Sequence, residues 1–225
     1  MKNNNRNLHE PDQNTLIYAV MHGKDSSARC AVLKKIVNIE TIMGDLLDDK
    51  DPNVRLVLTE KIGIGEKDLL KRIALCDESK YVRCAAVRKI KDIETLIAIA
   101  LNDQEEDVRN AAADQYGHME RSDRSRAAER ISDTDALIYI ASQDEDALIR
   151  LEAVKKIDDE KALTQEALHD QDQRVQTAAV RRIAALYGTE ALGRVMQQAD
   201  DRYIRKYARK QAAGKNDIKG REASE

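Results

Sequence analysis

The sequence contains no tryptophan and no phenylalanine, and its only aromatic residues are seven tyrosines. It has two prolines and nine glycines among 225 residues, so few positions force a turn or interrupt a helix. No segment shows the alternation of apolar and polar residues that marks a half-buried strand. Apolar residues make up 42% of the chain, mostly alanine, leucine, isoleucine and valine, and this composition predicts an all-α protein.

Long apolar segments are also missing from the sequence. The N-terminus, MKNNNRNLHEPDQ, lacks the apolar region of a secretory signal, and no later run approaches the length of a membrane span. Cys30, Cys76 and Cys84 are odd in number and fit no metal-ligand spacing, so we expect free thiols and no bound metal. These features predict a cytoplasmic protein without membrane contact.

Motifs that would indicate catalysis are absent as well. His9, His22, His118 and His169 lie in unlike contexts, and the sequence has no nucleophile elbow and no glycine-rich phosphate loop. We therefore expect a protein that is not an enzyme, with no catalytic residues and no cofactor.

What the sequence does contain is an internal repeat. The segment YVRCAAVRKIKDIETLIAIALND, residues 81–103, is similar to LIRLEAVKKIDDEKALTQEALHD, residues 148–170. In each unit an aspartate precedes an arginine by six residues, and apolar residues three and four apart flank both. The pairs are Asp49 and Arg55, Asp77 and Arg83, Asp103 and Arg109, and Asp144 and Arg150, whereas Asp170 is followed by Gln176. This pattern predicts two short antiparallel helices per unit.

The spacing of the units predicts how they assemble. Arginines at 29, 55, 83 and 109 are separated by 26, 28 and 26 residues, and positions 124, 150 and 176 by 26 and 26. Two helices of about ten residues are marginal alone, so they must bury their apolar sides against neighbouring units. We expect a solenoid of about seven helix pairs over residues 11–212, with disordered tails at 1–10 and 213–225.

The pattern D-x-x-x-x-[VI]-R-x-x-A, as in DESKYVRCAA, DQEEDVRNAA and DEDALIRLEA, resembles the HEAT or PBS-lyase HEAT-like repeat, and the resemblance covers roughly residues 12–212. The resemblance implies a right-handed α-solenoid with a period of about 26 residues. The segment before the aspartate would be the convex outer helix, and the segment that begins at V-R the concave inner helix. The short unit and the last one, DDRYIRKYARKQA, further resemble the repeat portion of bacterial proteins that join such repeats to a coiled coil.

The aspartates and arginines of the repeat have a structural interpretation. An aspartate at the turn can cap the following helix, and an arginine can bridge to the aspartate of a neighbouring unit. The expected ladder comprises Asp49, Arg55, Asp77, Arg83, Asp103, Arg109, Asp144 and Arg150. On this hypothesis Arg109→Ala lowers the free energy of unfolding by about 1–2 kcal/mol.

The repeat pattern is interrupted at residues 117–131. Ser122 and Asp123 are good N-cap residues, and a short apolar stripe follows them, so the segment predicts an irregular extra helix. It is either a unit that lost its outer helix or an insertion. Arg124 and Ile131 keep the seven-residue step between arginine and isoleucine of the other units, which favours the first alternative.

Cations recur at fixed places in the repeat, since two of them precede the terminal isoleucine of several units, and arginines crowd residues 121–130. They either complement the helix dipoles or form a row that binds an anionic partner. The residues predicted to contact a partner are Arg88, Lys89, Arg121, Arg124, Arg126, Lys155, Lys156, Arg181 and Arg182. Tyr203 and Tyr207, with the cations around them, either cap the final unit or add a further patch.

These observations favour a non-enzymatic adaptor or regulatory scaffold that holds another protein on its concave inner-helix surface, as a monomer or weak dimer. The first alternative is binding of a nucleic-acid backbone through the basic doublets. A net charge of −3 and the scarcity of aromatic side chains argue against it. The second alternative is an enzyme of the lyase type known on HEAT-like scaffolds.

Overall fold

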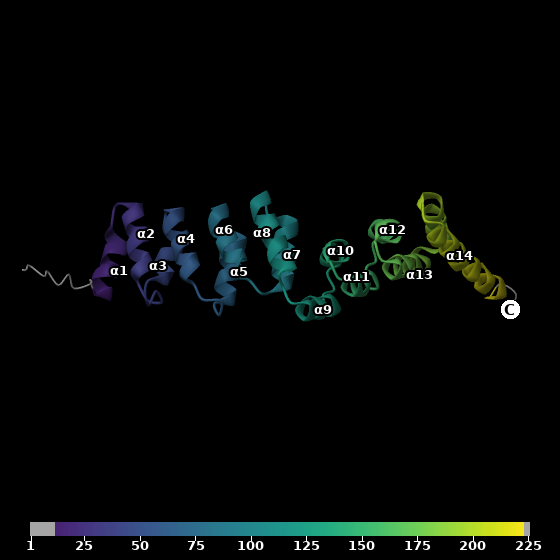
Figure 1. The fold of residues 1–225 in the computed structure, drawn as a ribbon, viewed down its shortest axis with the longest axis horizontal. Coiled ribbons are helices and arrows are strands. Elements are labelled where there is room, and N and C mark those ends of the chain that lie inside the picture. Colours follow the sequence, from purple (N-terminus) through teal and green to yellow (C-terminus); the bar gives the residue numbers. More distant parts are fainter. Residues whose placement is uncertain (1–11, 223–225) are drawn as a thin grey trace, which may run out of the picture. The chain divides into compact units, whose positions relative to one another are not determined.

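The computed structural model describes residues 12–222, with side chains through residue 214. Within this part of the chain the fold contains helices and no strands, which confirms the prediction of an all-α protein (Figure 1). The helices are α1 (Gln13–His22), α2 (Ser26–Lys35), α3 (Met43–Leu47), α4 (Pro52–Lys61), α5 (Lys67–Cys76), α6 (Lys80–Val87), α7 (Ile93–Asn102), α8 (Glu106–Gly117), α9 (Arg121–Arg130), α10 (Thr134–Gln143), α11 (Ala147–Val154), α12 (Glu160–His169), α13 (Gln173–Gln198) and α14 (Arg202–Glu222).

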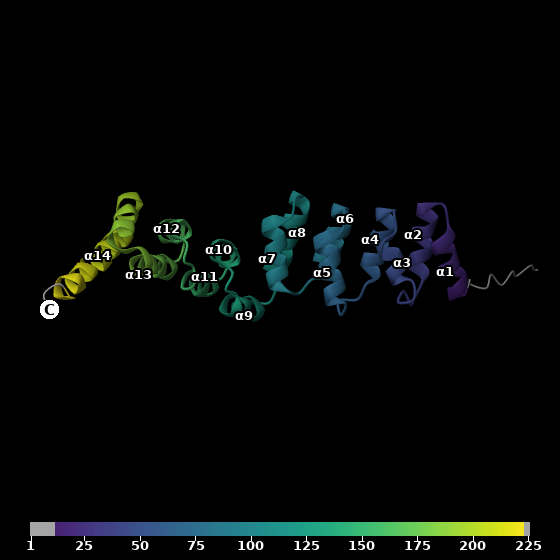
Figure 2. The ribbon, with the colours of Figure 1, turned by 180° about the vertical axis from the view of Figure 1, so that it is seen from behind.

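The chain forms two compact units, which divide between Gln115 and Tyr116. In the first unit α2 packs against α4 and α4 against α6, while α5 pairs with α6. In the second unit α9 packs against α11, α11 against α13 and α13 against α14, while α10 pairs with α11 and α12 with α13 (Figure 2). Within each unit the helices therefore pack against neighbours that follow one another along the chain, as helices do in an α-solenoid.

Aspartates begin most of these helices. At each such N-cap the carboxylate accepts a hydrogen bond from a backbone N–H two or three residues further on, which satisfies one of the free donors of the first turn. The capping residues are Asp12, Asp25, Asp51, Asp92, Asp133, Asp146, Asp159 and Asp172. The acidic runs of the sequence therefore belong mainly to the turns.

The segment at residues 117–131 forms α9, and no outer helix lies between α8 and α9. Within α9, Arg124 and Ala128 are buried, and the helix packs against α11 as the other inner helices pack against theirs. This arrangement corresponds to a repeat unit without its outer helix.

One long helix is kinked, and one boundary differs from that expected. Gly188 has φ 75° and ψ −156° inside α13, so this element is two helices that meet at a kink, residues 173–187 and 189–198. A residue without a Cβ adopts this conformation readily, whereas other residues are strained there. Helix α14 continues through Glu222, past the boundary expected at residue 212. The tail expected at residues 1–10 and the last residues, 223–225, lie outside the described part.

One side of α14 is polar where the corresponding side of α6 is apolar. The positions one and four residues after the repeat arginine are Cys84 and Val87 in α6, and both are buried. In α14, where Arg205 holds the arginine position, the corresponding residues are Lys206 and Arg209, and both are exposed. Solenoids need such a polar surface wherever no further unit covers an end. None of the described helices is both long and apolar enough to cross a membrane.

Candidate functional site

The repeat arginines and aspartates form paired contacts between successive helix pairs, which we call the ion-pair ladder. In one rung, Arg83 Nε and Nη2 donate to the two carboxylate oxygens of Asp103 at 2.9 and 2.8 Å. The two side chains are only 4% and 9% exposed. The other rungs are Arg29 with Asp49, Arg55 with Asp77, Arg124 with Asp144, and Arg150 with Asp170.

The side chains of each rung also form hydrogen bonds with the backbone of the turns next to them. Asp103 ends α7 and accepts the backbone N–H of Glu105 at 2.9 Å, while Arg83 Nη1 donates to the carbonyl of Asp77 in its own turn at 2.9 Å. The hydrogen bond to Asp103 raises the pKa of Arg83. Burial raises the pKa of Asp103, but the hydrogen bonds from Arg83 and from the Glu105 N–H outweigh it, so the pKa of Asp103 is lowered. Both groups therefore stay charged.

One residue expected on the binding surface lies inside this ladder. Arg124 is 3% exposed, and its Nε donates to Asp144 at 3.0 Å. The hydroxyl of Tyr116, which takes the place of an isoleucine, donates to the same carboxylate at 2.5 Å. Arg124 is therefore not available for contact with a partner, and its role in the ladder corrects the sequence-based expectation. The signal for this role was the seven-residue step to Ile131.

Arg109 differs from the other ladder arginines. Its Nη1 donates to the carbonyls of Asp103 and Gln104 at 2.8 and 3.2 Å, and no carboxylate partner is found for it among the described residues. We expect Arg109→Ala to lower the free energy of unfolding by about 1 kcal/mol, at the lower end of the range expected from sequence. Arg83→Ala should lower it by about 3 kcal/mol, because Asp103 would keep a buried charge. Urea denaturation of both variants checks this, and equal losses would contradict it.

The ladder stops after Asp170, where both members of the next rung are replaced. Gln176 occupies the arginine position in α13, and Ala199, the residue that ends α13, occupies the aspartate position. Arg205 Nη1 donates to the carbonyl of Ala199 at 2.8 Å, as the other arginines do to the aspartate of their own turn, and this assigns the register. Losing both charges together leaves no buried ion without a counter-ion.

A second series of contacts uses the residue before each terminal isoleucine, and we call it the carbonyl-cap series. Lys89 Nζ donates to the carbonyls of Thr59, Glu60 and Ile62, at the end of the preceding inner helix, at 2.6–3.0 Å. The same position is used by Lys61 on Lys34, by Gln115 on Ile90, by Lys156 on Ala128, Glu129 and Ile131, and by Arg182 on Lys156 and Ile157. A cation at a helix C-terminus satisfies free carbonyls and complements the helix dipole.

The carbonyl-cap series separates the two members of three basic doublets. Lys89, Lys156 and Arg182 are half-buried and bonded to backbone, whereas Arg88, Lys155 and Arg181 are exposed. The electrostatic alternative considered from sequence therefore describes the second member of these three doublets. Each of these side chains caps the preceding helix, however, instead of its own. In these three doublets only the first member faces solvent, whereas Lys34 and Lys35 before Ile36 are both exposed.

A matched pair of substitutions tests this division of roles. Lys156→Met should lower the free energy of unfolding by about 1–2 kcal/mol, because it leaves carbonyls at the end of α9 without their charged donor. Lys155→Met, one residue earlier, should have little effect, because Lys155 is exposed and, among the described residues, forms an ion pair only with Glu152 of its own helix. Thermal denaturation followed by circular dichroism distinguishes them. A larger shift for Lys155→Met would assign the roles the other way round.

Two positions that neither set of contacts uses are exposed on every inner helix. They lie two residues before and five residues after the repeat arginine, which places them seven apart on one helix face. In the second unit they include Leu148 and Lys155 on α11, Arg174 and Arg181 on α13, and Tyr203 and Lys210 on α14. In the first unit they include Ser27 and Lys34 on α2, Asn53 and Glu60 on α4, and Tyr81 and Arg88 on α6. We call this set the inner-helix face.

The other two residues predicted to contact a partner are on α9. Arg121 and Arg126 are both exposed, and they pair with Asp146 and Asp123, respectively. The side chains of Arg121 and Arg126 are 59% and 65% exposed, so water screens these ion pairs and the guanidinium groups can exchange partners.

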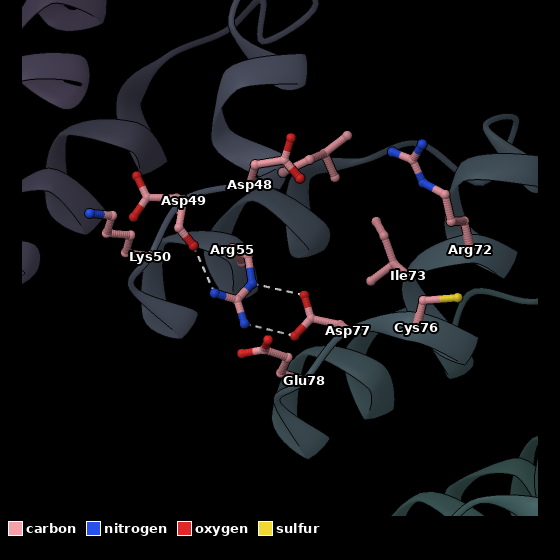
Figure 3. Close-up of a pocket in the computed structure, with 10 residues that line it drawn as sticks. Asp48, Asp49, Lys50, Arg55, Arg72, Ile73, Cys76, Asp77 and Glu78 are labelled. Carbon is pink, nitrogen blue, oxygen red and sulfur yellow. Dashed lines mark hydrogen bonds and ion pairs between the residues drawn. The ribbon is translucent and has the colours of Figure 1, made fainter.

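A pocket of about 580 Å³ opens beside α3 and α5 of the first unit. Helix α3 has five residues, whereas α5 has ten, so less of the neighbouring surface is covered there. Figure 3 shows Arg55 between Asp49 and Asp77, with Arg72 and Cys76 both on α5. The remaining lining residues are Leu47, Asp48, Lys50, Ile73 and Glu78. Several of these charges are held in the ion-pair ladder, and the sequence did not predict this pocket.

Glu166 is a buried carboxyl that the sequence analysis did not single out. It lies four residues before Asp170, at the position that Ile73, Ile99 and Ile140 hold in other outer helices, and it is 9% exposed. Burial raises the pKa of Glu166 to about 7, the negative charge of Asp170 adds to the rise, and Arg150 opposes it. The signal in the sequence was the replacement of a recurring isoleucine by an ionisable residue.

No group of three or more metal-ligating side chains occurs within the described part of the chain, and the three cysteines are free thiols. Comparison of the sequence with models of known protein families gives no match, and a search of curated proteins also finds none.

Proposed function

We propose that this protein is a non-enzymatic adaptor or regulatory scaffold that binds another protein on the inner-helix face. The proposed architecture is a right-handed α-solenoid of HEAT-like helix pairs with a period of about 26 residues. The constant register of the ion-pair ladder supports it, because four rungs join residues 20 apart and the fifth joins residues 22 apart.

The observation that carries this function is the exposed inner-helix face itself. The ladder, the carbonyl-cap series and the N-cap aspartates account for the other recurring charged residues, yet large side chains recur at two exposed positions that none of these contacts uses. Among them Tyr81, Leu148 and Tyr203 are 67%, 44% and 47% exposed, at the same position of α6, α11 and α14. Exposed aromatic and aliphatic side chains next to cations are typical of protein-binding surfaces.

Affinity capture from a cell lysate tests the proposal. The bait is the wild-type chain or a variant with Arg88, Lys155 and Arg181 all replaced by glutamate, and the control bait carries Lys67→Glu and Lys161→Glu on outer helices. We expect the wild-type and control baits to retain the same protein, with or without nuclease, and the triple variant to lose it. Retention by the triple variant would contradict the proposal. Loss on nuclease treatment would favour binding of a nucleic-acid backbone.

A further inference from the structure

We propose that the inner-helix face of the second unit, formed by α11, α13 and α14, binds an extended acidic segment of a partner protein. In this complex the carboxylates of the segment pair with Lys155, Arg181 and Lys210. The inference rests on the proposed scaffold function, and it names the part of the inner-helix face and the chemistry of the partner.

The three cations hold equivalent positions on consecutive inner helices. Each lies five residues after the arginine position of its helix, and all three are exposed. Because α11 packs against α13 and α13 against α14, these equivalent positions form a row across the helices. No carboxylate partner is found for Arg181 or Lys210 among the described residues, whereas Lys155 pairs with Glu152 at 2.6 Å.

Charge distinguishes this row from the same position elsewhere. In the first unit Lys34 on α2 and Arg88 on α6 are separated by Glu60 on α4, so the sign alternates from helix to helix. In the second unit the corresponding residue of α9 is Glu129, and the uninterrupted cationic row begins at α11. A row of one sign attracts a partner of the opposite sign, and an alternating row does not.

The neighbouring row favours a polypeptide over a nucleic acid. It lies two helical turns away and consists of Leu148, Arg174 and Tyr203. Leu148 offers an apolar contact that suits an aliphatic side chain. Tyr203 is the only aromatic residue of the row, and it already stacks on Tyr207 with ring centroids 6.1 Å apart. Proteins that bind single strands present several aromatic platforms for successive bases, and this row does not.

The distance between neighbouring inner helices sets the spacing expected for the acidic residues of the partner segment. Packed helices lie about 8–10 Å apart, and a chain in the extended polyproline II conformation advances about 3.1 Å per residue and repeats its side-chain direction every three residues. Carboxylates at every third residue of an extended segment would therefore meet cations on successive helices. A repeating Glu-Leu-Ser peptide has this spacing and supplies an aliphatic side chain for Leu148.

Fluorescence anisotropy of the labelled Glu-Leu-Ser peptide with the full chain tests the inference. Arg181→Glu should weaken binding about tenfold, since an attraction becomes a repulsion at a partly solvated pair. Glu152→Gln should strengthen binding, because it releases Lys155. Lys161→Glu, an equal change of charge at an exposed site on the outer helix α12, should leave the affinity within about twofold.

A peptide of the same composition with its glutamates contiguous, and an oligothymidylate of equal charge, serve as competing probes. Tighter binding of either probe, or equal losses for Arg181→Glu and Lys161→Glu, would overturn the inference. In the capture experiment, separate reversals distinguish the two proposals. If Arg88→Glu abolishes capture and Arg181→Glu does not, the scaffold function stands and the assignment to the second unit fails.

Discussion

Replacing Arg124 with alanine should cause the largest loss of stability among single substitutions in the ladder, about 3–5 kcal/mol. The reason is the burial of its partner, because the side chain of Asp144 is fully buried. Without Arg124 this carboxylate would keep hydrogen bonds from the Tyr116 hydroxyl and the Asp146 N–H, but it would have no counter-ion. Urea denaturation at neutral pH measures the loss.

The chain itself suggests the control for this experiment. In the rung that would follow Arg150 and Asp170, Gln176 replaces the arginine and Ala199 replaces the aspartate. The double variant Arg124→Gln and Asp144→Ala reproduces that neutral pair in the ladder. It should be at least as stable as Arg124→Gln alone, since it removes the uncompensated charge as well as the arginine. If the two single losses simply add, the two side chains do not stabilise the fold as a pair.

Replacing Glu166 with isoleucine should raise the free energy of unfolding at pH 8 by about 3 kcal/mol, which makes it the largest expected stabilisation. The folded-state pKa of Glu166 is about 7, above its ordinary value of 4.5. Its favourable contribution is therefore fully present below pH 4.5 and is lost as the pH rises through 7. Each unit of pKa difference corresponds to about 1.4 kcal/mol, which sets the size of the effect.

The pH dependence separates this charge effect from improved packing. Glu166→Gln keeps the shape and stays neutral, so it should match the wild type near pH 5 and be more stable above pH 7. Gln165→Glu, at the exposed neighbouring position on α12, should leave the pH profile unchanged. Chemical denaturation at several pH values from 5 to 8.5 gives the comparison. A constant difference between Glu166→Gln and the wild type over that range would sink the prediction.

Local sequence predicted some of the ion pairs in the ladder but not all of them. The six-residue step from aspartate to arginine predicted where rungs would form, because a fixed offset at a turn places the same side chains at the same point in every unit. The step could not predict that Arg109 donates only to carbonyls, nor that Arg124 belongs to the series. Those outcomes depend on which residue the neighbouring unit presents, and at α9 the outer helix that would normally present an aspartate is missing.

The binding surface was the harder part to predict. Adjacent cations in a doublet look alike in sequence, yet Lys155 is exposed and Lys156 donates to the end of α9. Successive residues of a helix differ by about 100° in direction. Which of the two reaches a neighbouring carbonyl therefore depends on where that neighbour packs.

The sequence by itself determined that this protein is helical and that its helices pack in order, because apolar periodicity and aspartate caps act within a few residues of the chain. The tertiary structure decided which charges stabilise the stack and which remain exposed. It also decided that Glu166 is buried beside a second carboxylate and that α13 breaks at Gly188. Burial and ion pairing depend on residues some 20–30 positions away, and only packing of the units brings those residues together.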